Sequence, residues 1–178
     1  LNHRRTLELG DRLSAGFQAS LALALHLEAC THLAELRGLF ERFHALHEDW
    51  AGTETAAIAG ISMFAHVRLT TTKAELEASS EDPAKIRAPG LAAFHDETVS
   101  ALTRCASVVC QIWMAVIFGE FDRAWSLTEL IAATHETLMF GSWVIPRFVL
   151  LDAIIVGARA AKASGAERRR LVRRLRKR

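Results

Sequence analysis

The chain has 178 residues, of which 51% are hydrophobic, and its formal net charge is +2. This composition excludes a disordered chain, because it supplies enough apolar side chains for the core of one domain or of several stacked repeats. Tyr is absent, Pro numbers only 3, and Ala and Leu dominate, so we expect an all-α fold with almost no strand.

Four helices are predicted in the first half of the chain. A short helix ends at Leu9, because Gly10 suits the residue that follows a helix. Apolar residues at helical spacing predict three longer helices, Arg12–Cys30, Leu33–Trp50 and Thr55–Ala78. The connections are short, so neighbouring helices are expected to pair as antiparallel hairpins.

A loop is predicted at about residues 79–95. It begins with the polar run Ser79–Asp82 and contains Pro83 and Pro89, two of the three prolines. We expect this loop to lie between two sub-blocks of a single helical region that covers residues 1–178.

Four more helices are predicted after the loop. Asp96 is the candidate cap of a helix that runs to Phe118, with an irregularity near Thr103 and Arg104. Pro146 is compatible with a helix because it falls in the first turn. The other three predicted helices are Phe121–Leu138, Trp143–Ala163 and a last helix from Ala166 onward.

The stretch Phe118–Trp125 is interpreted as the tight turn of a helical hairpin. Gly119 can adopt the positive φ that ends one helix, and Phe121 and Ala124 lie three residues apart on the next. Together with the turn at Gly10, about three tetratricopeptide periods of about 34 residues earlier, it suggests one unit of a repeating series.

Three segments support a resemblance to a known family: Leu9–Ala19, Phe118–Ala124 and Phe148–Ala153. Gly119-x-Phe121-x-x-Ala124 is similar to the second helix opening of a tetratricopeptide repeat. In this order, the segments resemble the helical repeat region of large bacterial signalling proteins. Those proteins join a serine/threonine kinase domain, an AAA-type or STAND-type ATPase, these repeats, and often a GAF and histidine kinase module.

The resemblance implies a tetratricopeptide-like α-solenoid of stacked antiparallel hairpins, without catalytic residues of its own. It extends from Leu9 to about Leu175. The chain departs from the family's pattern in the Pro83–Pro89 region and in its arginine-rich last helix. Because the chain begins at Leu1 and stops within a periodic helix, we expect it to be a fragment of a longer protein.

Two apolar runs are candidates for a membrane span. Ala106–Gly119 is about 14 residues long and contains Gln111, while Trp143–Val156 is interrupted by Arg147 and Asp152. Both fall short of the roughly 18 to 20 apolar residues that cross a bilayer, so buried helices are predicted and no membrane span.

The cysteines indicate a reducing compartment. Cys30, Cys105 and Cys110 are odd in number and lack a CxxC spacing, so free buried thiols are predicted. No signal peptide opens the sequence. We therefore expect a cytoplasmic location.

Candidate metal and catalytic motifs are incomplete. Glu41-x-x-His44 lacks the second copy and the two further glutamates of a di-iron site. His44 and His47 do not form the His-Glu-x-x-His zinc motif, because Glu48 follows the second histidine.

Two histidine–carboxylate pairs, His95 with Asp96 and Glu97, and His135 with Glu136, have no nucleophile motif, and no glycine-rich phosphate loop occurs. The prediction is a protein that is not an enzyme, with no catalytic residue, no cofactor and no metal. Its binding residues stay unknown at this point.

Two features of the second half leave an alternative open. The apolar stripe Val109, Ile112, Trp113, Val116 and Trp125 is interpreted as core, with a partner groove as the alternative. Residues 167–178 hold eight basic residues and a single acid, so the remainder of the chain is net acidic.

That basic helix is interpreted as a solvated outer face, while binding to nucleic acid or to an anionic membrane surface is the alternative. The predicted function is a non-catalytic scaffold or protein-interaction segment of a multidomain signalling ATPase or kinase. Its partner is another protein or a neighbouring domain. The second hypothesis is a nucleic-acid- or anionic-surface-binding regulator that uses the basic C-terminal helix.

Overall fold

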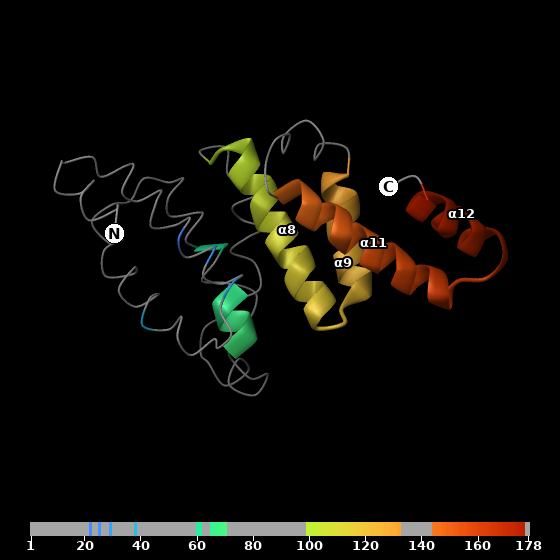
Figure 1. Ribbon diagram of the computed structural model, residues 1–178, viewed down its shortest axis with the longest axis horizontal. Coiled ribbons are helices and arrows are strands. Elements are labelled where there is room, and N and C mark those ends of the chain that lie inside the picture. The colour runs from blue at the N-terminus through green and yellow to red at the C-terminus, as the bar shows by residue number, and fades with distance from the viewer. Residues whose placement is uncertain are drawn as a thin grey trace. The chain divides into compact units, whose positions relative to one another are not determined.

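The structure is a computed structural model that describes residues 22, 25, 29, 38, 60–61, 65–70, 99–132 and 144–176 (Figure 1). Its named helices are α8 (Ala101–Ile117), α9 (Phe121–Ile131), α11 (Val144–Lys162) and α12 (Gly165–Arg176). No strand occurs among the described residues, which confirms the all-α prediction there. The tetratricopeptide-like stacking stays a prediction.

Residues described in the first half are also helical. They fall within the predicted helices Arg12–Cys30, Leu33–Trp50 and Thr55–Ala78. The turn at Gly10 and the loop at 79–95 lie outside the described residues. The chain divides into two compact units, Leu1–Thr103 and Arg104–Arg178, and the second contains α9, α11, α12 and all of α8 except its first three residues.

Helix α8 begins later than the sequence predicted. The hydroxyl of Ser100 accepts a hydrogen bond from the backbone N–H of Thr103 at 3.2 Å, which satisfies one of the otherwise unpaired N–H groups of the first turn. The helix starts at Ala101, so the predicted start at Asp96 is wrong. It continues without a break through Thr103 and Arg104, where the sequence predicted an irregularity.

The middle of α8 is buried on nearly all sides, consistent with its mainly apolar sequence. Cys105 and Cys110 are buried free thiols, as predicted, while Cys30 lies outside the described residues. Gln111 is also buried, and its amide has no hydrogen-bond partner within the part of the chain that the structure describes.

The predicted tight turn between the helices α8 and α9 is confirmed. Gly119 has φ 72°, its N–H donates to the carbonyl of Val116, and the N–H of Glu120 donates to the carbonyl of Ala115. These two hydrogen bonds form a Schellman motif, which satisfies carbonyls that the helix end leaves unpaired. Ala124 is fully buried, consistent with its predicted packing role.

The Gly119→Ala substitution should destabilise the protein by about 1 kcal/mol, because a Cβ is disfavoured at positive φ. Gly157→Ala is the matched control, since Gly157 lies within α11 and a Cβ there meets no atom within 4 Å. That change should stabilise the protein by about 0.5 to 1 kcal/mol. Urea unfolding measures the change in stability of both variants. If the two substitutions changed the free energy of unfolding in the same direction, the assigned turn would be contradicted.

Helix α11 matches its predicted bounds to within one residue and has Pro146 in its first turn. It presents one buried stripe of helical periodicity, made of Val144, Phe148, Leu151, Asp152, Ile155, Val156 and Ala160. Both α9 and α12 contact α11, and the chain turns back after Lys162 so that α12 lies beside it (Figure 1). The observed α9 ends at Ile131, and the rest of the predicted Phe121–Leu138 helix lies outside the described residues after Ala132.

Candidate functional site

Helix α12 has an inner face that packs on the protein. Leu171 is 2% exposed and forms a core cluster with Val156 and Ala160 of α11. Partly buried side chains surround this cluster: Trp125, Ala163, Val172 and Leu175. Burial of a leucine side chain contributes about 1.5 to 3 kcal/mol, so Leu171 is the main apolar anchor of α12.

Arg174 lies on the same face as Leu171, three residues further along the helix. Its Nη2 donates to Oδ1 of Asp152 on α11 at 2.7 Å, and its Nη1 donates to Oε1 of Glu129 on α9 at 2.8 Å. One guanidinium group therefore connects α12 to two other helices. The forked geometry of arginine allows both hydrogen bonds at once.

The environment of Arg174 keeps it protonated. Burial lowers its pKa, but the hydrogen bonds and charges of Glu129 and Asp152 outweigh burial and raise the pKa above the usual arginine value. Because the pKa of Arg174 is higher in the folded than in the unfolded state, its protonation stabilises the fold. This stabilisation is complete at any pH below the unfolded-state pKa and is lost only as pH rises through the folded-state pKa. The Arg174 contribution is therefore constant across the neutral range.

Trp125 of α9 is in contact with two guanidinium groups. The Cζ atoms of Arg159 and Arg174 lie 4.5 and 4.8 Å from the centre of its ring, within the range of cation–π attraction. Arg159 also forms a 3.4 Å ion pair with Asp122. We call Asp122, Trp125, Glu129, Asp152, Arg159 and Arg174 the Trp125 cluster.

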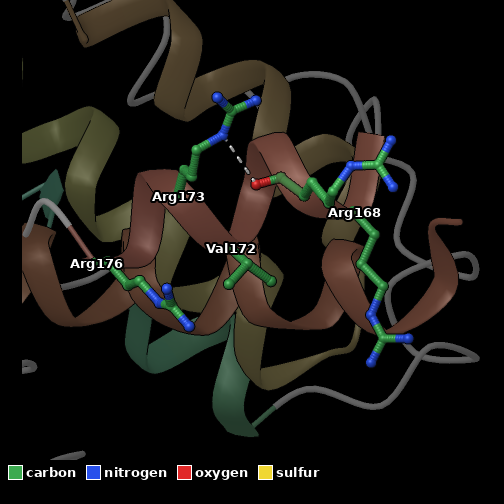
Figure 2. A pocket seen from close by; sticks show the side chains of 5 residues that line it. Arg168, Val172, Arg173 and Arg176 are labelled. Carbon is green, nitrogen blue, oxygen red and sulfur yellow. Dashed lines mark hydrogen bonds between the residues drawn. The ribbon is translucent and has the colours of Figure 1, made fainter. Parts of the chain in front are cut away.

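The remaining arginines of α12 are exposed. We call these five the outer arginines: Arg168, Arg169, Arg170, Arg173 and Arg176. Within the described residues, four of them and Val172, all on α12, line an open depression on the protein surface, which we call the α12 groove. Figure 2 shows Val172 in this groove with the Arg168, Arg173 and Arg176 side chains around it.

Charge is distributed unequally between the two faces of α12. In the Trp125 cluster, three carboxylates accompany two guanidinium groups. No ion pair joins an outer arginine to a carboxylate within the described residues, and Glu167 is the single acid of α12. The outer face is therefore strongly positive. Nε of Arg173 donates a 3.4 Å hydrogen bond to the backbone carbonyl of Arg169 in the same helix.

The helical state of α12 depends on its contacts with α9 and α11. It has only 12 residues, and isolated helices shorter than about 12 to 15 residues are marginal in water. Repulsion between arginines four residues apart, such as Arg169 and Arg173, destabilises it further. The charges of Glu167 near the N-terminus and of the arginines near the C-terminus interact favourably with the helix dipole, but each of these interactions stabilises the helix only slightly.

The predicted stripe lies partly in the core. Val109 and Ile112 are buried, while Trp113, Val116 and Trp125 are half-buried. The guanidinium of Arg147 lies 4.7 Å from the centre of the Trp113 ring. Both of these tryptophans therefore combine apolar packing with a cation on one face.

The predicted metal and catalytic candidates lie outside the described residues. They are Glu41, His44, His47, Glu48, His95, Asp96, Glu97, His135 and Glu136. Within the described ranges, no three side chains of His, Cys, Asp or Glu are placed to hold a metal ion.

The sequence did not predict the partners of Arg174. Asp152 is 1% exposed, and the sequence showed it only as an acid that interrupts an apolar run. A lone carboxylate on the buried face of a helix requires a partner, since an unpaired buried charge is costly. That signal indicates a basic partner, but spacing does not select one arginine from eight basic residues in the tail.

Two further observations concern membrane spans and similarity to known proteins. Among the helices of the described residues, none combines the length and the apolar character needed to cross a membrane. The relation to multidomain signalling proteins stays a prediction from the sequence. Comparison of the chain with protein-family models, with curated proteins and with solved structures finds no match.

Proposed function

We propose that the chain is a non-catalytic interaction segment that presents the outer arginines of α12 to an anionic partner. The observation that supports this function is that the arginines of α12 lie on two different faces of the helix. Arg174 is directed inward and fixes the helix, while five arginines remain exposed without a carboxylate partner among the described residues. A positive surface held on a fixed helix attracts anions with little loss of backbone freedom on binding.

We also propose that the wider setting of this surface is a helical repeat scaffold of a larger signalling protein. Support comes from the hairpin of α8 and α9, which has its glycine at positive φ and a fully buried Ala124. A small residue at that position permits close contact between helices, as stacked hairpins require. The neighbours of the scaffold are other domains of the same protein.

Binding of a fluorescently labelled heparin fragment to the full 178-residue chain tests the anionic-partner proposal. The variant Arg169→Gln/Arg173→Gln/Arg176→Gln should raise the Kd about tenfold, because three charge contacts of a few tenths of a kcal/mol or more are lost. Circular dichroism checks that the helix content of the variant is unchanged.

The matched control is Arg4→Gln/Arg5→Gln/Arg12→Gln, which removes the same net charge from another part of the sequence. It should leave the Kd within about twofold of the unsubstituted chain, since the bulk net charge acts weakly once salt screens it. Equal losses in the two variants would mean that net charge, and not the α12 surface, determines binding.

A further inference from the structure

We infer that the occupant of the α12 groove is the phosphate backbone of nucleic acid, an inference that rests on the proposed interaction function. The residues that carry it are the outer arginines and Val172. The alternatives are an anionic membrane surface and an acidic protein, and three properties of α12 favour nucleic acid over both.

The first property is the spacing of the arginines. Arg169, Arg173 and Arg176 follow one another at intervals of four and three residues, so they share a helix face and lie about 6 and 4.5 Å apart along the axis. From Arg168 to Arg176 the helix rises about 12 Å, a length over which duplex DNA presents about seven phosphate charges. Over this length the duplex therefore presents more phosphate charges than the three arginines that share this face.

The second property is the position of the apolar side chains. Leu171 is buried against α11, and Val172 and Leu175 are partly buried around the same cluster. A helix that binds stably to a membrane surface inserts an apolar face among the lipids. In α12 that face already packs against the rest of the protein, so only charge attraction would contribute to binding at a membrane surface.

The third property is the composition of the groove. The described residues of its lining are four arginines and one apolar residue, Val172. Protein–protein interfaces depend on an apolar or aromatic centre from which charged residues are depleted, whereas protein–DNA interfaces are polar and strongly positive. The α12 groove resembles the second kind of interface.

The exclusive use of arginine in α12 fits the same ligand. The described part of this helix contains no lysine among its basic residues. Guanidinium groups form paired hydrogen bonds with phosphate oxygens and are more weakly hydrated than ammonium groups. Phosphate contacts of this kind do not depend on base identity, so binding to nucleic acid should be insensitive to sequence.

The test compares three anionic probes with the full chain at 50 mM salt. They are a labelled 20-bp DNA duplex, poly-glutamate of equal total charge, and phosphatidylcholine vesicles with 30% phosphatidylserine matched in accessible anionic lipid. We expect the duplex to bind at least tenfold more tightly than poly-glutamate or the vesicles. Arg169→Gln/Arg173→Gln/Arg176→Gln should weaken duplex binding by about tenfold or more.

The outcomes separate the two proposals. Equal or tighter binding to poly-glutamate or to the vesicles overturns the nucleic-acid inference but leaves the anion-binding surface intact. Absence of binding to all three probes, and to heparin, overturns both. The variant Arg169→Lys/Arg173→Lys/Arg176→Lys guards against misfolding, because it keeps the charge and loses only the paired hydrogen bonds of the guanidinium groups. It should bind the duplex more tightly than the glutamine variant but less tightly than the unsubstituted chain, and a loss as large as that of the glutamine variant overturns the inference.

Discussion

Arg174→Met is expected to lower the free energy of unfolding by about 2 to 3 kcal/mol. Removing one partner of a buried ion pair costs about 3 to 5 kcal/mol, because the other charge stays buried without compensation. Asp152 is 1% exposed, but the Arg174 side chain is 27% exposed and partly screened by solvent, so the expected loss lies at or just below the lower end of that range. Urea unfolding of the full chain, followed by tryptophan fluorescence, measures the change.

Two control variants separate the buried pair from the exposed one. Arg174→Met/Asp152→Leu should recover most of the lost stability, because replacing both buried charges by apolar groups is often neutral or stabilising. Glu129→Gln should cost less than about 1 kcal/mol, since the Glu129 side chain is 49% exposed. A double variant less stable than Arg174→Met alone would contradict the assigned pairing of Arg174 with Asp152.

Trp125→Ala is expected to destabilise the protein by about 3 kcal/mol. Truncation of a buried tryptophan costs about 3 to 5 kcal/mol, and Trp125 is half-buried, so the lower end applies. The substitution also removes the aromatic ring that Arg159 and Arg174 contact, and cation–π contacts at such sites add about 0.5 to 1 kcal/mol each. The midpoint of thermal unfolding by circular dichroism reports the effect.

The matched control is Trp125→Phe, which keeps an aromatic ring next to the two guanidinium groups. Its cost should be less than half that of Trp125→Ala, because most of the apolar contact is retained. If Trp125→Ala instead leaves the melting temperature unchanged and abolishes binding to a partner, the ring belongs to an interaction surface and its assignment to the packing of α12 is wrong.

Local features of this fold could be predicted from the sequence because their causes are local. Gly119 between two apolar runs indicates a helix end, and the structure has it at positive φ with the expected hydrogen bonds. Pro146 limits the start of α11 in the same way. The start of α8 was misplaced because Asp96 and Ser100 are both acceptable caps by residue type.

The arrangement around Trp125 could not be predicted, because its contacts join residues far apart in the sequence. Arg174 pairs with Asp152 and Glu129, which lie 22 and 45 residues earlier. Periodicity places Arg174 on the same face as Leu171, but the partner of that face depends on how α9, α11 and α12 pack. The distinction between one inward and five outward arginines therefore required the structure.

The salt dependence of duplex binding reports how many phosphates the outer arginines contact. For the full chain and for Arg169→Gln/Arg173→Gln/Arg176→Gln, the logarithm of the binding constant is measured against the logarithm of salt concentration on a 20-bp DNA duplex. Each phosphate contact contributes about 0.9 to the slope, so loss of three contacts should reduce its magnitude by about 2.7. Equal slopes for the two proteins would contradict the claim that the outer arginines of α12 bind the phosphate backbone.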